Sequence, residues 1–116
     1  MDNNLVDFDK VNDLLENDPA YIREFSEAAI SSFTTFQQDY RNNLLERDLE
    51  KLRKTGHRIK PVAQMVGVEQ INREYERAKE LIKREADDEE IHNSVDKIET
   101  MCDQVIEDFN QKIEQL

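Results

Sequence analysis

Apolar residues recur along this chain at steps of three and four, the spacing that places side chains on one face of an α-helix. Four such stripes cover residues 22–44, 49–66, 68–82 and 91–116. At 100° per residue, each stripe is rotated by roughly 110° or more relative to the stripe before it. One straight helix cannot bury two such stripes against a single core, so the sequence predicts four long helices separated by turns.

The residues between the stripes indicate where the helices end. The first turn is expected near residues 46–48, with Asp48 as the N-cap of the following helix, although no glycine or proline marks it. The second is expected at Gly67, because glycine tolerates the left-handed conformation that ends helices. The third is expected near residues 86–88, where an acidic run suits a helix N-terminus.

A shorter helix precedes these four. It is expected over residues 9–16, and Asp18 and Pro19 then begin the first long helix as its cap and its first helical residue. Strand signals are nearly absent, and short turns make sequential helices antiparallel. The sequence therefore predicts an all-α fold, an antiparallel up-down-up-down four-helix bundle with a short additional N-terminal helix. It predicts a single domain over residues 1–116.

The composition narrows the range of partners. The chain has 27 acidic and 16 basic residues and a net charge of −11, which disfavours binding to nucleic acid or to an anionic membrane surface. No apolar run is long enough to span a membrane, and the start of the chain is polar and acidic, unlike a secretory leader. The single cysteine, Cys102, forms no disulfide framework, so the expected location is the cytoplasm.

One histidine lies away from the apolar stripe of its helix. The position of His57 is roughly 130° from the centre of that stripe, so its imidazole is expected to face solvent. Arg53, Lys60 and Gln64 fall on the same side of the helix. The other histidine, His92, lies in an acidic stretch and is expected only to solvate the surface.

Basic residues gather around His57 although the chain as a whole is acidic. No Asp or Glu occurs between Glu50 and Glu69. The basic residues that lie within ten positions are Lys51, Arg53, Lys54, Arg58 and Lys60. A neutral imidazole is a nucleophile at physiological pH, and an exposed nucleophile among positive charges is suited to carrying a phosphoryl group. No Gly-rich phosphate loop, metal cluster or catalytic triad accompanies it in the sequence.

The sequence around this histidine follows a known motif. The pattern is His, any residue, an apolar residue, Lys and Gly, with a second Gly several residues later; His57, Ile59, Lys60 and Gly67 match it, and Pro61 stands where Gly is usual. The other matching positions are Phe8, Asp9, Leu14, Leu15, Asp18, Pro19, Phe25, Leu49 and Leu52. Over nearly its whole length the chain thus resembles the histidine-containing phosphotransfer (HPt) domains of phosphorelays.

This resemblance implies a phosphorelay intermediate, in which His57 accepts a phosphoryl group from a receiver-domain aspartate and passes it to another receiver. Lys60 would be its positive neighbour. The expected binding residues are Arg53, Gln64, Pro61 and Gly56. No cofactor or metal of its own is expected, because the receiver supplies Mg²⁺, and no free-standing kinase activity is expected. The expected partners are response-regulator receiver domains, a hybrid histidine kinase, or both, with the domain itself a monomer.

Two other functions fit parts of the sequence. The dimerisation and phosphoacceptor module of a sensor histidine kinase has a similar motif, but it usually has an acid directly after the histidine and its proline one position later. In a non-catalytic adaptor bundle, His57 is incidental and accepts no phosphoryl group. Light scattering separates the first alternative, an obligate dimer, from an HPt monomer, and a phosphotransfer assay separates the second.

Overall fold

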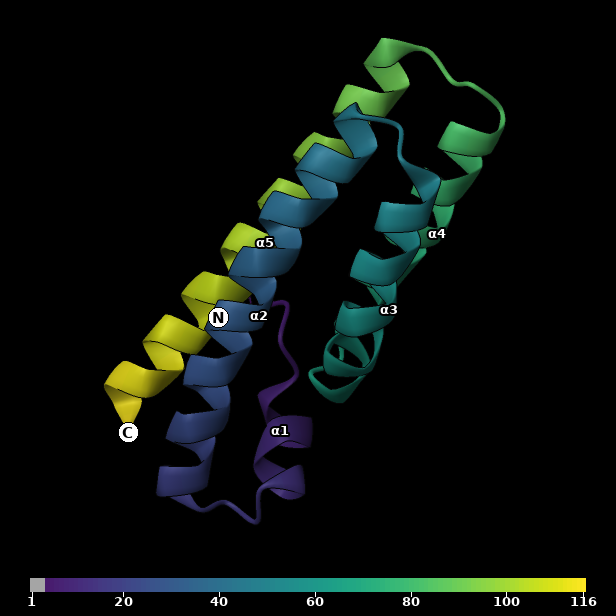
Figure 1. The fold of residues 1–116 in the computed structure, drawn as a ribbon. Coiled ribbons are helices and arrows are strands. Elements are labelled where there is room, and N and C mark those ends of the chain that lie inside the picture. Colours follow the sequence, from purple (N-terminus) through teal and green to yellow (C-terminus); the bar gives the residue numbers. More distant parts are fainter. Residues whose placement is uncertain (1–3) are drawn as a thin grey trace.

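Five helices make up the fold in a computed structural model that describes residues 4–116 (Figure 1). They are α1 (Phe8–Leu14), α2 (Pro19–Leu45), α3 (Leu49–Met65), α4 (Glu69–Lys83) and α5 (Asp88–Gln115). Every regular element in this range is a helix, which confirms the predicted all-α class. None of these helices is long and apolar enough to cross a membrane. Residues 1–3, part of the polar start described above, lie outside the described range.

The first helix ends earlier than the sequence pattern predicts. It stops at Leu14, because Glu16 and Asn17 both have a φ of 56°, in the left-handed region where an α-helix does not continue. Asp18 then accepts a hydrogen bond from the backbone N–H of Ala20 (2.9 Å), as predicted for the cap of α2.

The three turns between the long helices fall where the apolar stripes change phase. Each turn contains one residue in the left-handed region, and these are Arg47 (φ 56°), Gly67 (φ 75°) and Glu85 (φ 54°). Only one of them is a glycine, so two of the turns lack the usual sequence signal. Asp48 and Asp87 cap α3 and α5, each by accepting a hydrogen bond from a backbone N–H (3.0 Å and 2.9 Å).

Each of the four long helices packs against two others. α2 contacts α3 and α5, and α4 also contacts α3 and α5. Figure 1 shows α2 and α5 side by side along most of their length. These two helices have 27 and 28 residues, whereas α3 and α4 have 17 and 15, so the longer pair extends past the shorter pair. α1 covers this end, where Phe8 packs edge-on against Phe109 with 5.6 Å between ring centroids.

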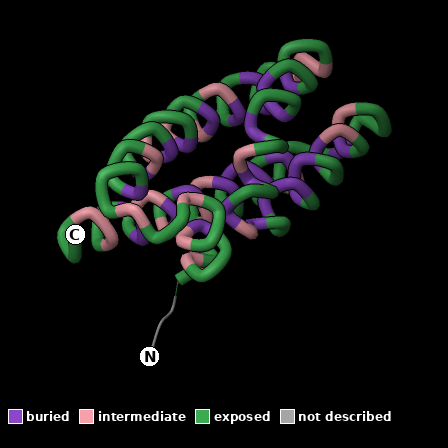
Figure 2. Tube along the Cα trace, turned by 90° about the horizontal axis from the view of Figure 1, so that it is seen from below, coloured by how far each residue is buried: buried purple, intermediate pink, exposed green. Residues whose placement is uncertain are grey.

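Buried residues lie on the sides of the helices that face one another, and exposed residues lie on the outer sides (Figure 2). Phe33, Phe36, Phe109 and Cys102 are buried, as their spacing predicts. Phe25 lies toward the end covered by α1 and is only partly buried, with its ring 6.1 Å from that of Phe109. Burial of these apolar side chains is the main driving force for folding.

The segment before α1 joins α5 to the end of α3. Asp108 of α5 is 1% exposed, and it accepts hydrogen bonds from the backbone N–H groups of Leu5 (2.7 Å) and Val6 (3.2 Å). These bonds compensate for the burial of the Asp108 carboxylate. The next backbone N–H, that of Asp7, donates to the carbonyl of Val66 (2.9 Å). The segment therefore fixes the C-terminal end of α3, the helix that carries the candidate histidine, relative to α5.

Candidate functional site: the exposed histidine of α3

His57 lies on the outward face of α3, as the helical phase predicts. Its side chain is exposed, whereas Thr55 and Ile59, two positions away on either side, are buried. Within residues 4–116, its neighbours on α3 form hydrogen bonds and ion pairs, but the imidazole of His57 forms none. Both ring nitrogens are therefore open to a partner, which a nucleophile needs when its substrate is carried by another protein.

Four of the other predicted site residues share this exposed face. Arg53, Lys60, Pro61 and Gln64 are all exposed, and α3 continues without interruption through the proline. At 100° per residue, they lie within roughly 60° of His57 around the helix axis. Proline has no N–H, so the carbonyl of His57 lacks its usual donor four residues later.

Gly56 is different, because it is buried against α4. A Cβ atom at this position would overlap the ring of Tyr75, so the close approach of α3 and α4 requires glycine here. The Tyr75 hydroxyl donates a hydrogen bond to the carbonyl of Arg53 (3.4 Å), which places the tyrosine across the turn before His57. The structure thus places Gly56 in the contact between two helices, one residue from the exposed face.

Acidic side chains from neighbouring helices reach the basic window of α3, which consists of Lys51, Arg53, Lys54, Arg58 and Lys60. Arg58 pairs with Asp39 of α2 (3.4 Å), and Lys60 pairs with Glu76 of α4 (4.0 Å). Of the five basic residues in the window, only Arg53 has no acidic partner within 4.0 Å among residues 4–116. Ion pairs therefore offset part of the positive charge that the sequence suggests around His57.

Glu76 bridges two lysines on the side of α3 that faces α4. One of its carboxylate oxygens, Oε1, lies 4.0 Å from the Nζ of Lys60, and the other, Oε2, lies 2.8 Å from the Nζ of Lys79. The hydrogen bond from Lys79 lowers the pKa of Glu76 and raises the pKa of Lys79. Lys79 also lies 4.9 Å from the centre of the Tyr75 ring, in a cation–π contact. α4 thus places one carboxylate between Lys60, on the exposed face of α3, and Lys79.

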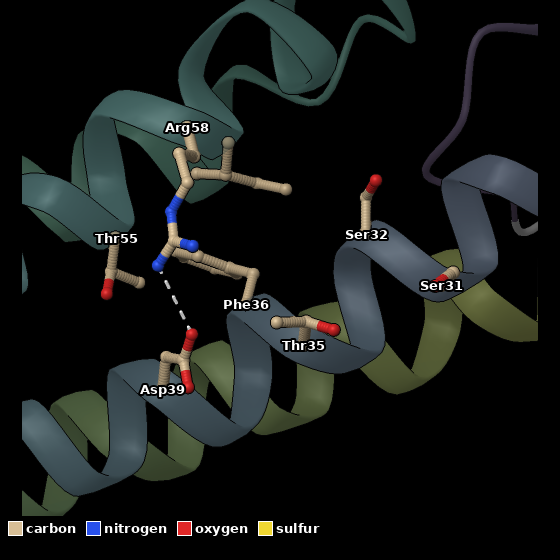
Figure 3. Close-up of a pocket in the computed structure, with 8 residues that line it drawn as sticks. Ser31, Ser32, Thr35, Phe36, Asp39, Thr55 and Arg58 are labelled. Carbon is tan, nitrogen blue, oxygen red and sulfur yellow. Dashed lines mark hydrogen bonds and ion pairs between the residues drawn. The ribbon is translucent and has the colours of Figure 1, made fainter.

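A cleft of about 240 Å³ lies between α2 and α3, beside the exposed face of α3 and on its side toward α2 (Figure 3). Ser31, Ser32 and Thr35 line it from α2, and Arg58 reaches over it from α3 toward Asp39. The small hydroxyl side chains leave room for side chains of a partner. The cleft begins one residue from His57, so a protein that contacts this histidine can also contact the cleft.

Sequence reasoning missed the residues that α4 contributes to this site. Tyr75 is apparent in the sequence only as a member of an apolar stripe, and Glu76 and Lys79 only as a pair with helical spacing. Neither signal says that Tyr75 packs on Gly56 or that Glu76 pairs with Lys60. Only the contact between the two helices brings them to the site.

Any functional conclusion about this chain rests on the residues described above. Comparison with protein-family models, with curated proteins and with solved structures found no match. Over residues 4–116, no three His, Cys, Asp or Glu side chains gather closely enough to hold a metal ion. What the described site offers chemically is an accessible imidazole with cations on the same face.

Proposed function

We propose that the protein is a phosphorelay intermediate of the HPt type. In this proposal His57 accepts a phosphoryl group from a receiver-domain aspartate and passes it to another receiver domain. The observation that carries the proposal is the exposed imidazole of His57, which has no bonded partner within residues 4–116 and has Arg53 and Lys60 on its face of α3. The fold we propose with it is an antiparallel up-down-up-down four-helix bundle with α1 at one end, which the contacts among α2, α3, α4 and α5 support.

The neutral imidazole of His57 is the nucleophile in this mechanism. The lone pair of Nε2 attacks phosphorus, the P–O bond to the receiver aspartate breaks, and the aspartate leaves as a carboxylate. The proton on Nδ1 then passes to solvent. In the second transfer, a carboxylate oxygen of the next receiver attacks phosphorus, the P–N bond breaks, and the imidazole takes up a proton again.

Positive charge beside the nucleophile assists both transfers. The oxygens of a transferring phosphoryl group are heavily charged, so cations and positioning supply most of the catalysis. Lys60 lies one turn after His57 and is the catalytic cation that we propose, while Arg53 adds charge one turn before it. Gln64 lies on the same face, where it can orient the ring or contact the phosphoryl oxygens. The receiver supplies Mg²⁺ and its acidic pocket.

The proposed partners are receiver domains of response regulators, of a hybrid histidine kinase, or of both. A receiver must bring its aspartyl phosphate to Nε2 of His57, so it has to cover the exposed face of α3. The cleft beside that face, with Ser32 and Thr35 on its α2 side, supports docking over α2 and α3. We propose that residues 1–116 form one domain that works as a cytoplasmic monomer, without nucleic acid or membrane contacts.

The test compares the two histidines of the chain, both of which are exposed. The wild-type protein, His57→Gln and His92→Gln are incubated with the receiver domains encoded in the same genome, each carrying a radioactive phosphoryl group. We expect at least one receiver to label the wild-type protein and His92→Gln but not His57→Gln, and to label Lys60→Ala more slowly. Undiminished labelling of His57→Gln, or no labelling of the wild-type protein by any receiver, would contradict the proposal.

A further inference from the structure

α4 contributes one acidic side chain to the cations beside His57. Glu76 uses both carboxylate oxygens, one toward Lys60 (4.0 Å) and one toward Lys79 (2.8 Å). The Glu76 side chain is 50% exposed, so burial does not force it to pair with the two lysines. Arg53 and Lys79 repel each other, since the positive charge of Arg53 lowers the pKa of Lys79 against the larger opposite effect of Glu76. The carboxylate therefore offsets the repulsion between Arg53 and Lys79 and pairs with Lys60 as well.

A phosphoryl group on His57 changes this balance. It brings close to two negative charges to a position one turn from Lys60. The new anion and the Glu76 carboxylate attract the same lysine, and they repel each other across the contact between α3 and α4. Glu76 lies farther from Lys60 than from Lys79. Lys60 can therefore leave the carboxylate with the smaller loss of electrostatic attraction.

We propose that Glu76 is a regulating residue that restrains phosphorylation of His57, because its carboxylate competes with the phosphoryl group for Lys60. This inference rests on the proposed role of His57 as the phosphoacceptor. A weaker hold on the phosphoryl group favours its departure, which suits an intermediate that must pass the group on. Lys79, held by Glu76 and Tyr75, keeps the carboxylate in place when Lys60 turns away.

A small phosphoryl donor isolates this effect from docking of a receiver. With potassium phosphoramidate, whose nitrogen is protonated near neutral pH, Nε2 of His57 attacks phosphorus, the P–N bond of the donor breaks, and the nitrogen leaves as ammonia. The proton on Nδ1 then passes to solvent. Hydrolysis of the phosphohistidine by water opposes this reaction. The measured quantity is the steady-state ratio of phosphorylated to free His57, followed by ³¹P NMR.

The matched variants are Glu76→Gln and Glu80→Gln. Each glutamate pairs with the lysine three residues later, Lys79 or Lys83, and each variant removes one negative charge from α4. Of these two glutamates, Glu76 pairs with Lys60 and Glu80 does not. We expect Glu76→Gln to raise the phosphorylated ratio about threefold at low salt, and Glu80→Gln to raise it by less than about 1.5-fold. The difference should shrink in high salt, because ions screen exposed charges.

A second background tests the competition for Lys60 itself. In Lys60→Gln, the effect of Glu76→Gln on the ratio should be clearly smaller than in the wild-type background, since the shared lysine is gone. Equal ratios in Glu76→Gln and Glu80→Gln, or an effect of Glu76→Gln that Lys60→Gln leaves unchanged, would overturn the inference. If the wild-type protein acquires no phosphate on His57 from either phosphoramidate or receivers, the phosphoacceptor role fails instead, which is a separate result.

Discussion

Glu74 and Glu76 lie two residues apart on α4 and have opposite environments. Glu74 is 8% exposed and bonds to a side chain of α5, whereas Glu76 is half exposed and reaches a side chain of α3. Two residues turn an α-helix by about 200°, so these carboxylates lie on nearly opposite sides. Each also pairs with a basic side chain three residues later, Arg77 at 3.0 Å and Lys79 at 2.8 Å. The local pattern is the same in both cases, and only burial separates them.

The Glu74 pair continues into the core as a chain of hydrogen bonds. Ser94 of α5 donates to Oε2 of Glu74 (2.6 Å), and the hydroxyl of Tyr40 of α2 lies 2.7 Å from the Ser94 oxygen. Because the single hydroxyl proton of Ser94 goes to Glu74, Tyr40 donates to Ser94. Burial raises the pKa of Tyr40, which keeps this donor protonated. The chain of bonds thus joins α2, α4 and α5.

The comparison shows how burial changes the role of a carboxylate. Water and salt screen the Glu76 pair, so it contributes little to folding and its charge acts on the surface around His57. Glu74 has lost most of its contact with water and depends on its protein partners, so the loss of the carboxylate leaves the buried hydroxyl of Ser94 without its acceptor. One side of α4 therefore stabilises the fold, and the other sets the charge beside the candidate histidine.

The largest expected difference between the two glutamates is the loss of stability when each carboxylate is removed. We expect Glu74→Ala to lower the free energy of unfolding by roughly 2–3 kcal/mol, because the buried hydroxyl of Ser94 loses its acceptor and Arg77 loses its acidic partner. Glu76→Ala should lower it by less than about 0.5 kcal/mol, since the pair is exposed. Urea unfolding followed by circular dichroism measures both values. Equal losses for the two variants would show that burial does not distinguish the two glutamates.

A substitution at Gly56 tests how closely α4 packs on α3 beside the candidate site. Alanine in the middle of a helix normally stabilises it by up to about 1 kcal/mol relative to glycine. Here the added methyl group overlaps the Tyr75 ring, so we expect Gly56→Ala to lower the free energy of unfolding by roughly 1–2 kcal/mol. The NMR signals of Tyr75 and Lys79 should shift as well. A stabilised variant with an unmoved Tyr75 would contradict the packing described here.

Between pH 8 and pH 10, alkaline pH acts mainly on buried groups. Burial raises the pKa of the Cys102 thiol to about 12 and also raises the pKa of Tyr40. The unfolded chain loses these protons at lower pH, so the stability is full below about pH 8.5 and falls as the pH rises toward 12. We expect a loss of roughly 2 kcal/mol between pH 8 and pH 10. The slope should be smaller in Cys102→Ala, and an unchanged slope would rule out this thiol as its cause.

The helices could be predicted from the sequence because they depend on local periodicity and capping. The change of phase places a turn at residues 46–48 without a glycine or proline, and Arg47 adopts the left-handed conformation there. The caps Asp18 and Asp48 and the exposure of His57 follow from the same local pattern. The early end of α1 did not follow from periodicity, because Glu16 is not a residue type that favours a positive φ, although Asn17 is.

The contacts between helices could not be predicted, because periodicity does not say which face meets which. The absence of acids between Glu50 and Glu69 describes only the chain neighbours of His57, whereas Glu76 reaches the site from another helix. Gly56 matches a site residue by its position next to His57, yet its surroundings make it a packing residue. The functional role of the predicted site residues stays a prediction until phosphoryl transfer is measured.

The most direct test of the central claim is to locate the phosphate after transfer from a receiver domain. The wild-type protein, labelled by the most active receiver, is digested at alkaline pH, where phosphohistidine is stable, and its peptides are sequenced by tandem mass spectrometry. The account predicts an acid-labile phosphate on His57 and an unmodified His92. A phosphate on His92 or on any other residue, with His57 unmodified, would contradict it.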